Sequence, residues 1–157
     1  MIKKIYPTLS LVVIFLSLSS CKSSILPHFL PLPKPVAVQI QEKKIDYLNS
    51  HGTGTVHNDL IETMIIKKYF GDINQQPLIN STKGLLGHTI GASGAIEAAV
   101  TALSISSGIL HGNITNNPVE NLNLIKTPIE KEINKAVSVS YGFGGHNAGL
   151  LLGKYDE

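Results

Sequence analysis

Three histidines in this chain lie inside glycine-rich stretches, and their type and spacing suit them best to chemistry. They are His51, His88 and His146. A neutral imidazole in a loop that follows or joins strands can meet a ligand and donate a hydrogen bond to it. Each one alone fits a structural role as well, whereas three such loops together favour a shared site.

Two charged residues flank His88 in the sequence. Lys83 precedes it by five residues, and Glu97 lies about one turn into the helix expected after it. We therefore expect the lysine and the carboxylate to converge beside the imidazole; the alternative is a surface ion pair worth under about 1 kcal/mol. The positive end of that helix disfavours imidazolium, which leaves His88 a neutral donor suited to polarising a carbonyl.

Other kinds of site fit the sequence less well. The glycines from 142 to 144 lack the third glycine of a phosphate-binding loop, and Ser93 is not in a G-x-S-x-G turn. A metal site is the main rival, but its residues match no helical zinc spacing such as H-E-x-x-H. We expect no metal and no other cofactor. The metal rival would use His51, His57, Asp59 and Glu62.

Alternating and helical patterns predict the elements that hold these loops. Residues 45–49 read as a strand that runs into the His51 loop, and Pro77 to Ile79 as a second short strand. Between them a helix is expected, with Asp59 and Glu62 as its capping box and Gly71 as its end. Its apolar stripe comprises Leu60, Ile61, Met64, Ile65 and Tyr69.

The rest of the chain continues the alternation of strand and helix. Residues 81–91 are too rich in glycine for a regular element, and a helix with apolar residues from Ile96 to Leu103 follows, ending at Gly108. Val137 to Ser140 and Ala148 to Leu152 read as a hairpin. This order predicts an α/β sheet with the loops gathered at strand ends.

Composition limits both the size of the fold and its partners. The chain has 157 residues, of which 43% are hydrophobic and 15% charged, so one core is expected. One cysteine excludes an internal disulfide. The net charge is only +2, and all 13 basic residues are lysines, which argues against a nucleic-acid partner.

The N-terminal region differs in character from the rest. Residues 1–20 have two lysines and an apolar run from Leu9 to Leu18, which is typical of a secretory signal, and Ser19-Ser20-Cys21 resembles a lipoprotein box. The alternative is a non-native apolar tail; either way we expect residues 1–20 to lie outside the fold. Four prolines make residues 21–43 a stiff linker, and a domain is expected over residues 44–155.

Three sequence blocks, in the same order, resemble the C-terminal half of β-ketoacyl-acyl-carrier-protein synthases. The resemblance covers about residues 44–155 and implies a thiolase-like α/β fold, present here as an incomplete C-terminal half. It also implies decarboxylative Claisen condensation of acyl and malonyl thioesters, as in fatty-acid or polyketide-type synthesis. The blocks are His51-Gly-Thr-Gly-Thr-x-x-Asn58-Asp59, Ser81-Thr-Lys-Gly-x-x-Gly-His88-Thr-x-Gly-Ala-Ser-Gly-Ala-Ile-Glu97 and Tyr141-Gly-Phe-Gly-Gly-His-Asn147.

The resemblance implies roles for individual residues. His51 and His88 match the pair that donates hydrogen bonds to the malonyl thioester oxygen. Lys83 would position His88 and pair with Glu97. The pantetheine arm of an acyl carrier protein would be held by two threonines, and Phe143 would gate the acyl pocket while its backbone N–H serves the oxyanion site. The threonines are Thr53 and Thr55.

The departures from the family pattern are large. The half that bears the nucleophilic cysteine is absent, and Cys21, 30 residues before His51, is assigned to lipidation instead. The resemblance also implies that the first strand of this half is missing from the middle of its sheet, which predicts unpaired backbone, uncovered apolar helix faces and marginal stability.

The sequence therefore favours a synthase fragment that is inactive alone. Its expected location is the cytoplasm, and a separate N-terminal half is a possible partner. The alternative is an exported lipoprotein that uses the half-fold as a non-catalytic binding module, with residues 1–20 as its only link to a membrane.

Overall fold

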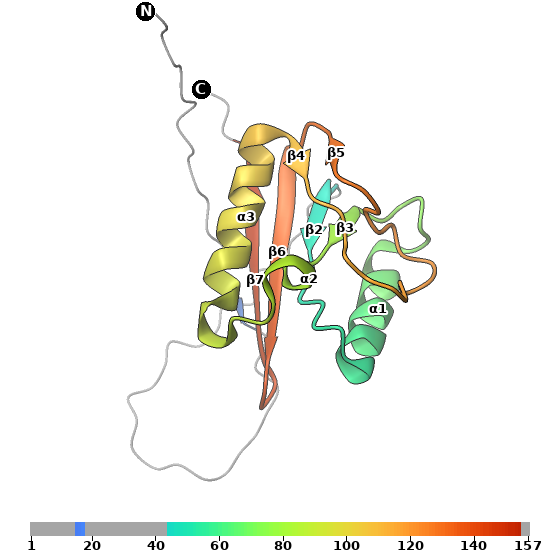
Figure 1. Cartoon of the computed structure of the whole chain (residues 1–157), viewed down its shortest axis with the longest axis vertical. Coiled ribbons are helices and arrows are strands. Elements are labelled where there is room, and N and C mark those ends of the chain that lie inside the picture. The colour runs from blue at the N-terminus through green and yellow to red at the C-terminus, as the bar shows by residue number, and fades with distance from the viewer. Residues whose placement is uncertain (1–14, 18–43, 155–157) are drawn as a thin grey trace, which may run out of the picture.

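The computed structural model describes residues 15–17 and 44–154, which form one five-stranded sheet with helices on both faces. The strand order is β1-β7-β6-β2-β3, and β2, β3 and β6 are parallel. Figure 1 shows α3 running alongside β6 and β7, with α1 beside β2 and β3. The strands are β1 (Phe15–Ser17), β2 (Tyr47–Asn49), β3 (Leu78–Asn80), β6 (Lys135–Gly142) and β7 (His146–Gly153).

The helices and smaller elements fall between these strands as the α/β pattern predicts. Helix α1 (Val56–Phe70) links β2 to β3, and α3 (Ser93–Ser107) links β3 to the later strands. Residues predicted to be a plain loop instead contain a one-turn helix, α2 (Lys83–Leu86), and a 3-10 turn, η1 (Ile90–Ala92). A two-stranded sheet is formed by β4 (Ile109–Leu110) and β5 (Ile129–Glu130).

The expectation of a gap in the middle of the sheet is wrong. Tyr47 of β2 pairs directly with Ala136 of β6, and Leu48 with Val137, so the backbone groups at the centre are hydrogen-bonded. Beyond β7 the sheet is extended by β1, antiparallel to it. Residues 15–17 therefore belong to the sheet, whereas residues 1–20 were expected outside the fold.

The core has two parts, one on each face of the sheet. One contains Tyr47, Ala136 and Leu152 with Ile105 of α3, and the other contains Leu48 and Val137 with Ile66 of α1. Because successive strand residues point to opposite faces, neighbours such as Tyr47 and Leu48 separate into the two clusters.

The predicted apolar stripe of α1 is present but uncovered. The buried residues of α1 are Glu62, Thr63 and Ile66. The stripe faces solvent: its most covered member, Ile65, is still 43% exposed. The expectation of uncovered apolar helix faces is thus confirmed on α1, although the sheet itself is continuous. The exposed residues of the stripe are Leu60, Ile61, Met64, Ile65 and Tyr69.

The predicted capping box at the start of α1 is wrong as well. The helix begins three residues before Asp59, with Thr55 at the N-cap, and the Thr55 side chain makes no capping hydrogen bond. Glu62 therefore lies in the second turn rather than the first, which frees its carboxylate for another use. Gly71 ends the helix as predicted, in a backbone conformation with φ of +79°.

Candidate active site

The carboxyl ends of three parallel strands bring the predicted loops together. His51 follows β2, Lys83 opens the one-turn helix after β3, and Tyr141 lies at the end of β6. The rings of His51 and His88 meet edge to face with centroids 5.7 Å apart. The ring of Tyr141 also meets that of His51, with centroids 5.6 Å apart. The site is thus built where the strand order predicts a ligand to bind.

Lys83 fixes the tautomer of His51. Its Nζ lies 3.1 Å from His51 Nδ1, and it is held on its other side by the carboxylate of Glu97. An ammonium can only donate, so Nδ1 accepts and the ring proton lies on Nε2. The ion pair of Lys83 with Glu97 is the one expected, but the lysine contacts His51 and not His88, where the sequence placed it.

The surroundings of His51 also keep its ring neutral. The residue is 6% exposed. Burial, reinforced by the positive charge of Lys83, lowers the pKa of the His51 imidazole from its ordinary 6.5 to about 4. At neutral pH the ring is therefore an uncharged donor.

His88 reaches the same tautomer by a different contact. Its Nδ1 accepts the backbone N–H of Ile90 at 3.0 Å and lies 3.2 Å from the hydroxyl of Ser93. An imidazolium has no free lone pair, so this geometry fits the neutral ring with its proton on Nε2. The donor is held by the 3-10 turn ahead of α3, close to the helix N-terminus that the sequence predicts. Both histidines thus keep an Nε2–H for a ligand.

Glu62 holds the loop that carries His51, a contact that the sequence analysis missed. Its two carboxylate oxygens accept the backbone N–H groups of His51 and Gly52, each at 2.8 Å. Burial raises the pKa of this carboxyl, against the opposing effect of these hydrogen bonds. Gly52 has φ of +41°, and an added Cβ would lie 2.5 Å from that of Ser81, so the loop requires glycine. The sequence analysis interpreted Glu62 as a capping residue of the helix or, in the metal alternative, as a ligand.

A buried asparagine of β2, Asn49, forms hydrogen bonds around the pair of Lys83 and Glu97. The side-chain amide of Asn49 donates to Thr82, to Thr101 and to the backbone carbonyl of Glu97. The Ser140 hydroxyl donates to the other Glu97 oxygen at 3.3 Å. This network joins β2, α2, α3 and β6. The position of the Lys83 side chain therefore depends on all four elements.

A wide cleft of about 1030 Å³ opens beside the two histidines. Thr53 and Thr55 lie on its wall with their hydroxyls 2.9 Å apart. Phe143, in the turn between β6 and β7, is fully exposed at its rim, and His146 lines it as well. The structure thus brings together all three loop histidines and the threonines and phenylalanine singled out from the sequence.

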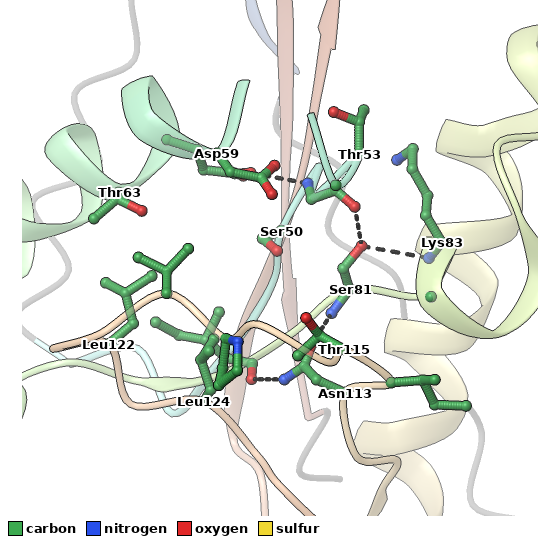
Figure 2. Close-up of a pocket in the computed structure, with 18 of the residues that line it drawn as sticks. Ser50, Thr53, Asp59, Thr63, Ser81, Lys83, Asn113, Thr115, Leu122 and Leu124 are labelled. Carbon is green, nitrogen blue, oxygen red and sulfur yellow. Dashed lines mark hydrogen bonds between the residues drawn. The ribbon is translucent and has the colours of Figure 1, made fainter. Parts of the chain in front are cut away.

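A smaller pocket of about 310 Å³ lies on the other side of the His51 loop. Figure 2 shows Lys83 toward one end and Leu122, Leu124 and Thr63 toward the other. Between them Ser81 donates its hydroxyl hydrogen to Gly52 O and accepts the N–H of Lys83. This hydroxyl ties the loop after β2 to the helix after β3.

The alternative of a metal site has no supporting geometry in the described part of the chain. No group of three or more histidine, cysteine, aspartate or glutamate side chains there is arranged to hold an ion. The Glu62 oxygens are occupied by backbone N–H groups instead. Cys21 and the remainder of residues 18–43, which carry the lipidation and linker predictions, lie outside the described residues.

Comparisons with known proteins show the family to which the chain belongs. Residues 36–117 match the family "Beta-ketoacyl synthase, C-terminal domain". The chain is 43% identical over 115 residues to "3-oxoacyl-[acyl-carrier-protein] synthase 1" of Buchnera aphidicola subsp. Acyrthosiphon pisum, a match that covers 71% of this chain and 28% of that protein. The chain therefore spans less than a third of the length of this relative.

Solved structures agree as well. The ishigamide ketosynthase/chain length factor has a TM-score of 0.68 and 32% identity, covering 74% of this chain and 29% of the other. A type II polyketide synthase acyl-carrier protein in complex with its ketosynthase, AntDE:AntF, has a TM-score of 0.65 and 29% identity, covering 71% and 28%. The fold is thus thiolase-like, as the resemblance implied, and the chain belongs to the β-ketoacyl synthase family, matching its C-terminal domain.

Proposed function

We propose that this chain carries the thioester-oxygen site of a β-ketoacyl synthase, in which His51 and His88 donate hydrogen bonds to a malonyl thioester. The observation that supports this proposal is that the His51 and His88 rings meet edge to face beside one cleft. Both Nδ1 atoms have partners, so both Nε2–H groups remain for a ligand in the wide cleft. A pair of neutral donors fits a carbonyl oxygen that becomes negative as the reaction proceeds.

The chemistry assigned to this pair is decarboxylation. The bond between the malonyl α-carbon and its carboxylate breaks, carbon dioxide leaves, and the electron pair moves into the thioester carbonyl to give an enolate. The two N–H groups stabilise that oxyanion, each typically contributing about 2.7 to 4 kcal/mol to lowering the barrier. A His51 pKa near 4 keeps its ring neutral, with Nδ1 free to accept from Lys83.

The other residues position the donors or bind the carrier arm. Lys83 and Glu97 act as positioning residues, since they hold His51 through its Nδ1. Thr53 and Thr55 present hydroxyls along the cleft wall, where they would hold a pantetheine amide. Phe143, free of packing, would gate the acyl end while its N–H serves the oxyanion site.

Condensation requires partners in this proposal. An acyl group must be carried on a thiolate before the enolate attacks it, and the one cysteine of the chain precedes the domain. We assign that step to a separate cysteine-bearing half and the substrate to an acyl carrier protein, with the whole assembly in the cytoplasm. The solved complex of a ketosynthase with its carrier protein supports the second partner.

The alternative of an exported lipoprotein remains a sequence hypothesis. Its evidence lies in residues 1–20 and Cys21, and the pairing of residues 15–17 with β7 works against it, because cleavage before Cys21 would remove that strand. Mass spectrometry of the chain expressed in bacteria decides it. A diacylglycerol-modified N-terminus at Cys21 would support export, and an intact Met1 with a free thiol would exclude it.

The test of the main proposal is malonyl-carrier decarboxylation by the full chain. We expect slow release of carbon dioxide, reduced about 10²–10³-fold by His88→Ala because one oxyanion donor is lost. His146→Ala serves as the matched control, since His146 lines the same cleft. Equal rates for the wild type and His88→Ala would refute the assignment. No condensation is expected until a cysteine-bearing half is added.

A further inference from the structure

The smaller pocket beside the His51 loop has a polar side and an apolar side. Its volume is about 310 Å³. Figure 2 shows Asp59 and Thr63 of α1 along this pocket, with Leu122 and Leu124 of the loop after β4 below them. The decarboxylation proposed above uses the wide cleft and gives this pocket no role. The apolar side comprises Ile66, Ile79, Val119, Leu122 and Leu124.

Thr63 brings a buried hydroxyl without a partner to this pocket. The residue is 7% exposed, and its hydroxyl makes no hydrogen bond to any residue within 15–17 and 44–154. Thr101 of α3 offers a direct comparison, because its hydroxyl donates to the backbone carbonyl of Glu97, one turn earlier, at 2.7 Å. Buried hydroxyls are nearly always hydrogen-bonded. The Thr63 hydroxyl therefore points to a partner that the described residues do not supply.

Asp59 adds a carboxylate to the same pocket, one helical turn before Thr63. The residue is half-buried, and its Oδ1 accepts the side-chain N–H of Asn58 at 3.0 Å. Its Oδ2 has no hydrogen bond and no ion pair within the described part of the chain. A charged acceptor makes a stronger hydrogen bond than a neutral one, and water screens a half-buried charge less than an exposed one. The free oxygen of Asp59 therefore favours a cationic donor.

The side chains around the pocket do not neutralise this carboxylate. Among the residues that line it, Lys83 and His88 could carry a positive charge. The Lys83 ammonium is bound to Glu97 and to Nδ1 of His51. The His88 ring is neutral, because its Nδ1 accepts the backbone N–H of Ile90. The described lining thus combines a carboxylate that lacks a cation, a hydroxyl that lacks a partner and an apolar side.

We propose that this pocket binds a small aliphatic amine in its ammonium form. An ammonium has three donors, so it can give one to the free oxygen of Asp59 and another to the Thr63 hydroxyl, while its alkyl chain contacts the apolar side. A carboxylate ligand is disfavoured by Asp59 and by the neighbouring Glu62, whose oxygens already accept backbone N–H groups. A neutral alcohol would leave the Asp59 charge without a cation.

Different glycines mark this pocket and the wide cleft. Thr53, in the loop after β2, lines both of them. Gly84 lines the pocket, whereas Gly91 and Gly94 line the cleft. The backbone amide signals of these glycines therefore show which of the two a ligand enters. The proposal is independent of the decarboxylation, because its test measures binding and not the reaction.

Titration of the full-length chain with n-butylammonium, followed by NMR of its backbone amides, tests the proposal. We expect saturable shifts at Gly84 with a dissociation constant on the order of 1 mM, and little change at Gly91 and Gly94. Ethylammonium should bind about tenfold more weakly, because two methylene groups are lost from the apolar side. Over the same concentration range n-butyrate and n-butanol should give no saturable shift at Gly84, since neither brings a cation.

Two variants and a control assign the binding to the proposed groups. Asp59→Asn should weaken n-butylammonium binding about tenfold, and Thr63→Val about threefold. The matched control is Asp72→Asn, at an exposed aspartate after the end of α1, which should change the affinity by about twofold or less. The proposal is overturned by the absence of saturable binding, by shifts at the cleft glycines alone, by equal affinity for n-butyrate or n-butanol, or by equal weakening in Asp59→Asn and Asp72→Asn. Should Asp59→Asn lose the native circular dichroism spectrum, Thr63→Val decides against the same control.

Discussion

The two faces of the sheet differ in which side chains their helices bury. On the α3 face, polar side chains are buried and paired: Glu97 binds Lys83, and Asn49 bonds Thr82 and Thr101. On the α1 face, the helix buries Glu62 and Thr63 and exposes its apolar stripe. The contacts that position Lys83 and His51 therefore all come from the described residues, whereas the apolar stripe of α1 lies uncovered.

This contrast separates two requirements that a folded enzyme usually meets together. A buried ion pair is costly unless it is well hydrogen-bonded, so the α3 face depends on the accuracy of its network. The α1 face depends on area, because an exposed apolar side chain lowers stability only by the burial it forgoes. We expect substitutions to have larger effects on the first face than on the second.

The largest expected effect is that of Glu97→Ala. It leaves the Lys83 ammonium buried without its partner, and we expect a loss of about 3–5 kcal/mol in the free energy of unfolding. Urea denaturation measures it. The exposed pair of Lys154 with Glu132 gives the control, since Glu132→Ala should leave the midpoint unchanged. Similar losses from both variants would erase the distinction between a buried network and a surface pair.

A second variant acts where the two faces meet. Glu62→Ala removes the acceptor of the His51 and Gly52 N–H groups, and we expect a loss of about 1–3 kcal/mol because two donors are left unsatisfied. Hydrogen exchange of these two amides should accelerate more than that of Ile105, which lies in the α3 cluster. Uniform acceleration would mean that Glu62 contributes to the fold in general rather than to this loop.

Acid should weaken the polar network through His51. Its pKa is about 4 in the folded chain and near 6.5 when unfolded, so between these values the unfolded state binds more protons. Stability contributed by the neutral ring is present above pH 6.5 and is lost as the pH falls toward 4. Urea midpoints measured over this range should decline for the wild type and less steeply for His51→Asn. Equal declines of the urea midpoint in the wild type and in His51→Asn would mean that another group causes the pH dependence.

The smallest effect is expected on the exposed apolar stripe of α1. Leu60→Lys and Met64→Lys should each change the free energy of unfolding by less than about 0.5 kcal/mol, because these side chains are 60% and 63% exposed. Light scattering should nevertheless fall, since the apolar patch is interrupted. A large loss of stability in either variant would show that this part of α1 is covered.

Local patterns in the sequence predicted much of the fold and the site. Strand, helix and glycine-loop signals placed His51 and His88 at strand ends, and the strand directions then brought them together. The pattern also gave both long helices, because each ends at a glycine that local geometry favours there.

What the sequence could not supply was the pairing of distant segments. Lys83 is 32 residues from His51 and five from His88, so proximity along the chain suggested the wrong partner. The direct pairing of β2 with β6 has no local signature either. The apolar run that contains β1 fits a signal segment and a strand equally well, since periodicity alone does not distinguish such runs.

The strand β2 is synthesised long before β6, its partner on one side. This strand has three residues, all buried, and its partner on one side is β6, with Tyr47 paired to Ala136, 136 − 47 = 89 residues later. At a synthesis rate of about 5–20 residues per second, β2 waits roughly 4–18 s on the ribosome before that neighbour exists. During that interval its edge and the apolar side of α1 are both open. The strand order therefore delays completion of this sheet until almost the whole domain has been synthesised.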